Sequence, residues 1–320
     1  MEHYVTLYDG LFLPQGLALH MSMERNAGEY TLWILCMDDE VHDALTKLEL
    51  PNVRLIQLSK LETPELLAIK STRSKGEYCW TLTPFAPRFV FEVDSEVLRV
   101  TYLDADLWFR KNPSAIFNEF DASGKDVLIT DHAYAPEHDQ SATSGQFCVQ
   151  FMTFTRNGGE AVRKWWEERC VEWCYARFED GKFGDQKYLD DWPENFTEQV
   201  HVLINKELAL GPWNATRFPY GNSVLWHFHS TRILKVAGRK LSVEIGPYKL
   251  PRQTRKYVYE PYLTDLQAAV DVMLRYGVNA KAQAKRNYFG KARPSLGLAY
   301  HKVRRMWQSA CHDPELESKN

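Results

Sequence analysis

Apolar positions in the first hundred residues alternate between a spacing of two, typical of strands, and a spacing near 3.6, typical of helices. The predicted elements, in chain order, are a strand over residues 4–8, a helix over 14–24, a strand over 31–36, a helix over 39–48 and a strand over 53–58. Because strands joined by helices pair in parallel through right-handed crossovers, this order predicts a Rossmann-like sheet flanked by helices.

The alternation continues through the middle of the chain. Further predicted elements are helices over 64–73 and 80–93, a strand over 97–103, a helix that begins at Asn112-Pro113, strands over 127–130 and 147–154, a helix from Gly159 to near Gly181, a turn into another helix over 183–189 and a strand over 223–229. We therefore expect an α/β protein with a mostly parallel central sheet. Residues 1–240 would form the main domain and residues 241–320 a helical, basic C-terminal extension.

Composition is that of an ordinary globular protein, since 44% of the 320 residues are hydrophobic and 25% are charged. No run of eighteen apolar residues occurs, and the first residues do not combine a basic segment with an apolar one, so we expect neither secretion nor a membrane span. The six cysteines include no CxxC pair, which favours reduced thiols. These features predict a cytoplasmic protein.

The net charge of −3 conceals a basic segment over residues 281–305, which contains no acidic residue. Its basic residues are Lys281, Lys285, Arg286, Lys291, Arg293, Lys302, Arg304 and Arg305. Aromatic residues lie among them, so we favour peripheral contact with an anionic membrane surface, which would be the inner one for a cytoplasmic protein. The alternative is a solvated tail that contacts RNA or nothing, and we expect no nucleic-acid partner.

Asp104-Ala-Asp106 is the clearest candidate for chemistry. It directly follows the β-branched, apolar strand predicted over 97–103, and side chains at i and i+2 of a strand point to one side. Two such carboxylates can share a divalent cation such as Mn²⁺ or Mg²⁺, whose other ligands would be phosphate oxygens. Asp-x-Asp also occurs by chance in solvated turns, but the end of a buried strand is where open α/β sheets bind ligands.

Two other segments narrow the choice of function. The turn at Asp9 contains no GxGxxG, which argues against a dinucleotide oxidoreductase. Residues 131–145 are rich in His, Asp, Ser and Gly and are typical of an active-site loop.

The order of these motifs resembles the GT-A glycosyltransferases, most closely family 8 of the glycogenin and lipopolysaccharide galactosyltransferase type. The resemblance covers residues 3–235, and its pieces are residues 5–9, 75–80, 102–106, 147–150, 184–186 and 227–230. It implies that Thr6, Tyr8 and Asp9 bind a uracil-type base and its ribose. Arg73 and Lys75 would contact the diphosphate or the sugar.

The resemblance also implies the metal ligands. Asp104 would contact both ribose and metal, and Asp106 would be the stronger metal ligand. The family's third ligand is the histidine of a His-Phe-x-Gly strand end, which aligns with His227 and places Ser230 where the family has glycine. His229 lies on the same strand face as His227 and is the alternative ligand.

Other positions match the donor-sugar side of the family. Asp185 and Gln186 match the pair beneath the donor sugar, although Asp185 could simply begin a helix. Asp131 matches a carboxylate that contacts the sugar. Two departures are Cys148 in place of asparagine and the missing lysine after the histidine motif, which would leave Arg232 or Lys235 to bind phosphate.

The implied activity is that of a metal-dependent hexosyltransferase that moves a sugar from a nucleoside diphosphate, expected to be UDP, to a glycan or lipid-linked acceptor with retention of configuration. An inverting enzyme would need a base, for which Asp131, Glu137 or Asp139 are candidates. Two alternatives are a sugar-phosphate nucleotidyltransferase and a non-catalytic module that binds nucleotide sugars.

Overall fold

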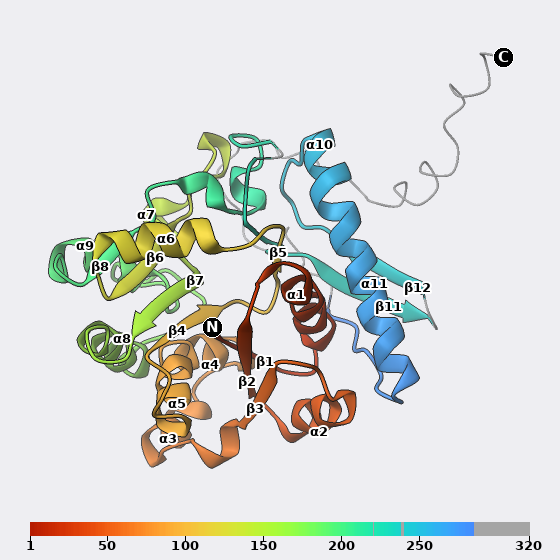
Figure 1. Ribbon diagram of the computed structural model, residues 1–320, viewed down its shortest axis with the longest axis horizontal. Helices are drawn as coiled ribbons and strands as arrows, with labels where there is room; N and C mark the ends of the chain where they lie inside the picture. Colours follow the sequence, from red (N-terminus) through yellow and green to blue (C-terminus); the bar gives the residue numbers. More distant parts are fainter. Residues whose placement is uncertain (220, 238–239, 285–320) are drawn as a thin grey trace.

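A seven-stranded sheet with strand order β3-β2-β1-β4-β7-β6-β8 forms the centre of the computed structural model, which describes residues 1–219, 221–237 and 240–284 (Figure 1). The strands are β1 (Glu2–Tyr8), β2 (Tyr30–Cys36), β3 (Val53–Gln57), β4 (Arg99–Leu103), β6 (Val127–Asp131), β7 (Phe147–Thr155) and β8 (Val200–Val202). All neighbours pair in parallel except β7, which runs antiparallel to both β4 and β6. The predicted α/β class with a mostly parallel central sheet is confirmed.

Helices cover both faces of this sheet (Figure 1). They are α1 (Leu13–Asn26), α2 (Asp39–Leu48), α3 (Pro64–Lys70), α4 (Lys75–Leu82), α5 (Phe85–Val93), α6 (Ser114–Ser123), α8 (Glu160–Glu172) and α9 (Trp192–Asn195); the short helix α7 (Ser141–Ser144) has no buried residue. Alternate side chains of β1 enter different cores: Tyr4 packs with α1, α2 and α6, whereas Val5 packs with α4, α5 and α8. A sheet buried on both faces explains why its strands are continuous apolar runs.

A smaller sheet with strand order β5-β10-β9 lies beside the main sheet. Its strands are β5 (Leu107–Phe109), β9 (Ala209–Leu210) and β10 (Leu225–His227). The chain continues through a hairpin of β11 (Arg232–Ala237) and β12 (Lys240–Glu244) into α10 (Arg252–Thr254), a π-helical turn over Arg255–Tyr259, and α11 (Glu260–Arg275).

Three predicted helices differ from the structure. The helix predicted over 80–93 is two helices, because Pro84 lacks the N–H that a continuous helix needs. The helix predicted to reach Gly181 ends at Glu172, and the predicted turn over 183–189 leads into a 3-10 helix over Lys187–Asp191.

The structure covers only part of the C-terminal region for which predictions were made. Residue 240 is the first residue of β12, and α11 packs on α1. The domain boundary predicted at residue 240 stays a prediction. Most of the basic segment falls in residues 285–320, outside the described residues, so the predicted membrane contact through 281–305 also stays a prediction. No helix in the described part is long and apolar enough to cross a membrane. Among the described residues, Cys36, Cys79, Cys148, Cys170 and Cys174 have free thiols.

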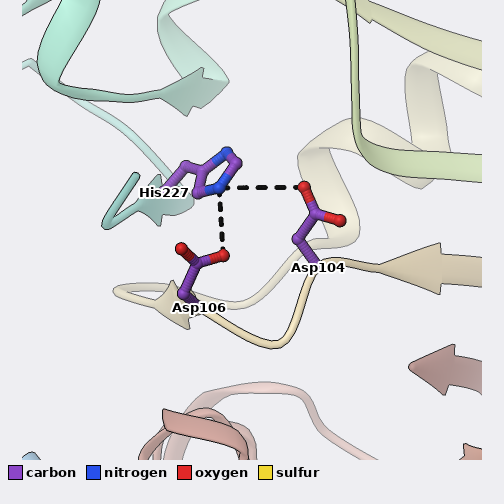
Figure 2. Close-up of side chains that lie close together, drawn as sticks. All are labelled: Asp104, Asp106 and His227. Carbon is purple, nitrogen blue, oxygen red and sulfur yellow. Dashed lines mark ion pairs between the residues drawn. The ribbon is translucent and has the colours of Figure 1, made fainter. Parts of the chain in front are cut away.

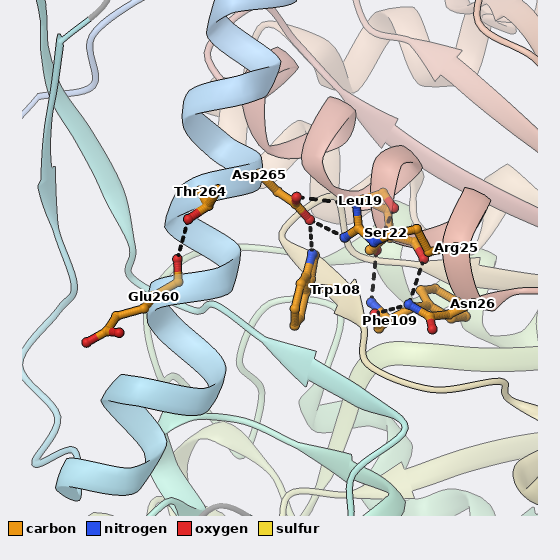
Figure 3. A network of polar contacts seen from close by, with 9 residues as sticks. All are labelled: Leu19, Ser22, Arg25, Asn26, Trp108, Phe109, Glu260, Thr264 and Asp265. Atoms are coloured by element: carbon orange, nitrogen blue, oxygen red, sulfur yellow. Dashed lines mark hydrogen bonds and ion pairs between the residues drawn. The ribbon is translucent and has the colours of Figure 1, made fainter.

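Polar contacts from α1 fix the backbone of β5 (Figure 3). The Phe109 N–H donates to the Ser22 hydroxyl at 2.9 Å, and that hydroxyl donates to the Leu19 carbonyl at 2.6 Å. Asn26 donates from its side-chain amide to the Phe109 carbonyl at 2.9 Å. Because β5 is a short strand directly after Asp106, these contacts determine where that carboxylate lies.

Helix α11 supports the same strand from the other side (Figure 3). The Trp108 indole donates to the Asp265 carboxylate at 2.7 Å, and Arg25 of α1 pairs with that carboxylate as well. The C-terminal helix is therefore joined through one acidic residue to both α1 and β5.

Removal of the Ser22 hydroxyl tests this support. We expect Ser22→Ala to lower the free energy of unfolding by about 1–3 kcal/mol, because the buried Phe109 N–H would lose its acceptor. Urea unfolding checks the value. Thr46→Ala is the matched control, since the Thr46 hydroxyl makes a similar bond to the His42 carbonyl on an exposed face of α2. It should change stability by less than about 0.5 kcal/mol, and equal effects of the two substitutions would contradict the argument.

Candidate active site

Asp104, Asp106 and His227 converge at one point, although the histidine lies more than a hundred residues away in the chain (Figure 2). The Nε2 atom of His227 lies 3.0 Å from Oδ1 of Asp106 and 3.7 Å from Oδ2 of Asp104. One ligand atom from each residue can be chosen so that all lie within 4.8 Å of one another. Such spacing suits three ligands around a single cation.

The two carboxylates meet for a different reason from the one predicted. Asp104 and Asp106 do not sit on one strand: β4 ends at Leu103, and the Leu107 N–H donates to the Asp104 carbonyl at 3.1 Å. This turn carries the chain from the main sheet into β5 of the small sheet. Strand β10 pairs antiparallel with β5 and places His227 opposite Leu107. The expected proximity is therefore produced by a turn between two sheets.

Gln150 of β7 organises the cluster and was not recognised in the sequence as a site residue. Its side-chain oxygen accepts from Nδ1 of His227 at 3.2 Å, and its backbone carbonyl accepts from the Asp104 N–H at 3.0 Å. Because an amide oxygen only accepts, Nδ1 carries the proton and Nε2 of the neutral ring is left to face the carboxylates. A fully buried glutamine in an apolar strand was the available signal.

The electrostatics of the cluster fit a site built for a cation. Burial lowers the pKa of His227, but the Asp106 and Asp104 carboxylates outweigh it and raise that pKa well above its usual value. Burial also raises the pKa of Asp104, which the Tyr102 hydroxyl contacts at 3.0 Å. A divalent cation would supply the positive charge in place of the imidazole proton. Two carboxylate oxygens and one imidazole nitrogen suit Mn²⁺ or Mg²⁺ completed by oxygen ligands.

His229 takes a different position from His227. Its Nδ1 atom lies 2.9 Å from the Tyr248 hydroxyl, and the two histidine rings are 5.9 Å apart between centroids. In the part of the chain that the structure describes, the three-residue group able to hold a metal contains His227 and not His229.

The cluster opens into a pocket of about 590 Å³ at the carboxyl ends of β1 and β4. Its lining contains most of the residues predicted for the site: Tyr8, Asp9, Lys75, Asp104, Asp106, Asp185, Gln186, His227, His229 and Arg232. Side chains from across the sequence thus meet in one cleft, as expected at the edge of a parallel sheet.

Two predicted residues of the nucleotide side lie elsewhere. Thr6 is fully buried within β1 and does not line the pocket. The Arg73 guanidinium donates to the Val171 carbonyl at 3.0 Å and lies 4.1 Å from the ring centroid of Tyr175. Arg73 therefore satisfies carbonyl groups at the end of α8, where no helical N–H can reach them.

The predicted acidic residues of the loop also lie outside the pocket lining. Asp131 is buried against Lys206, whose ammonium donates to it at 2.7 Å; burial raises its pKa, but this contact and those from the Ala133 and Gln146 amides bring it below the usual value. Glu137 and Asp139 are exposed, and Asp139 accepts from the Ser141 N–H at 2.9 Å. Lys235 is exposed on β11 and is not part of the lining either.

Asp185 and Gln186 also line the pocket. Asp185 is buried, and burial followed by the nearby Asp104 charge raises its pKa to about 7. Gln186 donates from its amide to the Ser144 carbonyl at 2.7 Å, which holds the side chain across the cleft. A carboxyl group that can change protonation near neutral pH is a frequent property of functional sites.

A group of aromatic residues in the pocket was not predicted from the sequence. Trp213 packs edge-to-face between His132 and His227, with ring centroids 5.0 and 5.2 Å away. Tyr134 and Tyr248 line the cleft beside it. The Gly-Pro-Trp-Asn sequence at 211–214 indicated only a turn, because contacts with residues eighty positions away leave no local pattern.

Comparison with known proteins assigns the fold. No protein-family model matches the chain. Two proteins of Bacillus subtilis (strain 168), both described as uncharacterized, are similar: YfnF is 32% identical over 288 residues, covering 84% of this chain and 93% of YfnF, and YfnD is 28% identical over 287 residues, covering 84% and 90%. A crystal structure of the galactosyltransferase LgtC in complex with donor and acceptor sugar analogs superposes with a TM-score of 0.52 and 14% identity, covering 83% of this chain and 95% of LgtC. The expected GT-A fold is confirmed.

Substitution of one carboxylate tests the metal cluster. We expect Asp106→Asn to weaken Mn²⁺ binding at least tenfold, because a neutral amide replaces a charged ligand. Titration followed by the EPR signal of free Mn²⁺ measures the affinity. Asp139→Asn, which changes an exposed carboxylate outside the pocket, should bind Mn²⁺ like the unsubstituted protein, and a normal affinity in Asp106→Asn would refute the assignment.

Protonation of Asp185 predicts a pH dependence of stability. Its native pKa of about 7 lies above that of an unfolded aspartate, so it stabilises the fold at low pH and this contribution is lost as pH rises toward and through 7. In EDTA, Asp185→Asn should gain stability relative to the unsubstituted protein between pH 5 and pH 8, by on the order of 2 kcal/mol. Urea unfolding at both pH values measures this change. Asp180→Asn, at an exposed turn, should show no such change; a pH-independent difference for Asp185→Asn would contradict the raised pKa.

Proposed function

We propose that this chain, which belongs to the protein family of Bacillus subtilis YfnF, is a metal-dependent glycosyltransferase of the hexosyltransferase type, similar to family 8. It would move a sugar from a nucleoside diphosphate, UDP, to a glycan or lipid-linked acceptor. The observation that carries the proposal is the Asp104, Asp106 and His227 cluster inside a cleft at the carboxyl edge of a GT-A sheet.

The nucleoside would bind at the end of β1. Asp9 accepts from the Leu11 N–H through Oδ1 at 2.9 Å, and its other oxygen has no hydrogen bond from a described residue. That oxygen suits an N–H donor such as the one on the edge of uracil. Tyr8 lines the same end of the cleft and would support the base.

The diphosphate would lie between this end and His227. A cation held by Asp104, Asp106 and His227 supplies Lewis-acid stabilisation to the leaving phosphate oxygens when it is bound. Lys75 at the first turn of α4 and Arg232 at the start of β11 also line the cleft and would add positive charge for the diphosphate.

The sugar would lie toward Asp185 and Gln186. Besides Asp104 and Asp106, the only carboxylates among the described lining residues are Asp9 and Asp185. The three candidate bases for an inverting reaction, Asp131, Glu137 and Asp139, are absent from that lining. This distribution supports transfer with retention of configuration.

The acceptor would enter past Trp213, Tyr134 and Tyr248. Aromatic rings offer flat apolar surfaces, and the C–H faces of pyranose rings pack well on them. This lining favours a glycan acceptor, either free or linked to a lipid.

A donor panel tests the proposed function. We expect a UDP-linked sugar to raise the melting temperature, because a ligand at a hundred times its Kd stabilises the native state by about 2.7 kcal/mol. The rise should occur only with Mn²⁺ present, because the diphosphate is proposed to bind through the metal. The rise should vanish in Asp106→Ala and persist in Asp139→Ala. Incubation with acceptor sugars should release UDP, and NMR of the anomeric proton should show a retained linkage.

Other outcomes identify the alternatives. Conversion of the nucleotide sugar and added pyrophosphate to a nucleoside triphosphate and a sugar 1-phosphate would indicate a nucleotidyltransferase, and binding without turnover would indicate a non-catalytic module. A thermal shift that survives Asp106→Ala would reject the metal assignment, and an inverted linkage would reject retention.

A further inference from the structure

One acidic residue joins the segment after Asp185 to the loop that leads into β7. Asp190 lies in the 3-10 helix over Lys187–Asp191, and its Oδ1 atom accepts from the Gln146 N–H at 2.7 Å. Its Oδ2 atom accepts from the Lys187 ammonium, also at 2.7 Å. Side chains three residues apart eclipse each other in a 3-10 helix, so the short helix itself places Lys187 beside Asp190.

Two further contacts join the same loop, residues 141–146, to this helix. The Lys187 ammonium donates to the Ser141 carbonyl at 3.0 Å. Gly145 has a φ of +104°, and a Cβ atom built on it would lie 3.3 Å from Oδ1 of Asp190. Glycine suits this position, because it tolerates the positive φ and lets the loop backbone approach the carboxylate closely. Both ends of the loop are therefore held by the ion pair of Lys187 and Asp190.

The loop in turn holds Gln186. The side-chain amide of Gln186 donates to the Ser144 carbonyl at 2.7 Å, and both residues line the cleft. Ser144 is the last residue of α7, a helix of four residues that buries none of its side chains. Because packing does not fix so exposed a helix, the contacts from Lys187 and Asp190 supply its support.

The ion pair itself stands behind the cleft and not in it. Neither Lys187 nor Asp190 belongs to the cleft lining, and their side chains are 17% and 23% exposed. An ion pair with this exposure contributes little to the stability of a fold. Its specific effect is on the position of the loop, which reaches the cleft at Ser144.

We propose that Asp190, together with Lys187, is a positioning residue for Gln186. The pair fixes α7, and the Ser144 carbonyl then holds the Gln186 amide in one orientation within the cleft. The inference rests on the proposed function, in which the donor sugar lies toward Asp185 and Gln186. A side chain held in place by such support needs no reorganisation when the sugar binds.

Turnover and binding measured on the same variants test the assignment. Turnover is the release of UDP from the nucleotide sugar that gives the largest thermal shift in the donor panel. Asp190→Ala should lower kcat about tenfold or more, because the Gln186 amide is no longer held against the sugar. The Kd for UDP, measured by calorimetry with Mn²⁺, should stay within about twofold, since UDP lacks the sugar.

Two other variants control for the loss of charge. Asp190→Asn keeps an oxygen that can accept from the Gln146 N–H, so its kcat should fall less than that of Asp190→Ala. Asp191→Ala removes the next carboxylate, which is exposed and makes no capping hydrogen bond, and should behave like the unsubstituted protein. An equal loss of kcat in Asp190→Ala and Asp191→Ala would contradict the assignment.

A double substitution separates positioning from general support of the fold. Gln186→Ala alone should lower kcat, and adding Asp190→Ala should lower it by less than about twofold more, because the amide that Asp190 positions is already absent. Losses that multiply would show that Asp190 acts independently of Gln186 and would overturn the proposal.

Hydrogen exchange of the protein without ligand tests the link between helix and loop. In Asp190→Ala the Gln146 N–H should exchange about tenfold faster or more, while the amides of β4 keep their protection and show that the fold is intact. Unchanged exchange at Gln146 would refute the link. If the unsubstituted protein turned over no nucleotide sugar, the proposed function would be rejected and the positioning role with it, whereas the exchange would still show whether Asp190 holds the loop.

Discussion

Two carboxylates held close together at a buried edge of the sheet are the constraint on which the rest of the site depends. Like charges at this distance repel, so the arrangement needs a compensating positive charge and firm support from the fold. His227 brings a third atom that is placed to bind the same cation, and Gln150 contacts both the His227 ring and the Asp104 backbone. The cluster is therefore defined by β7 as much as by the strands that carry its ligands.

The small sheet and the helices packed around it hold these carboxylates in position. Strand β5 begins one residue after Asp106, and its backbone is held by Ser22 and Asn26 of α1 and its indole by Asp265 of α11. Contacts far from the cleft thereby set the position of a ligand within it. The C-terminal helix α11 therefore contributes to the support of the strand that follows Asp106.

Several features of the cleft are unfavourable for the fold alone. Asp185 is buried with a pKa near 7, and Ser230 occupies a backbone conformation suited to glycine. Proteins usually break local rules of this kind at functional sites, because a ligand completes the interactions there. The concentration of such features along one cleft agrees with a site that is complete only when a charged ligand is bound.

The sequence by itself determined the order of the main-sheet strands from β1 to β7 and of the longer helices between them, and it located Asp104 and Asp106 at the end of a buried strand, because these features follow from local periodicity. The choice between His227 and His229 required the tertiary structure, since both alternate to the same strand face and only the contacts with Gln150 and Tyr248 distinguish them. Arg73 and Asp131 were assigned to the cleft from the resemblance to the glycosyltransferase family, whereas in the structure the end of α8 and Lys206 engage them outside the cleft lining. Local sequence patterns identify elements and motifs within one stretch of the chain. The cleft, in contrast, is lined by residues that are distant in the sequence and meet only in the folded structure.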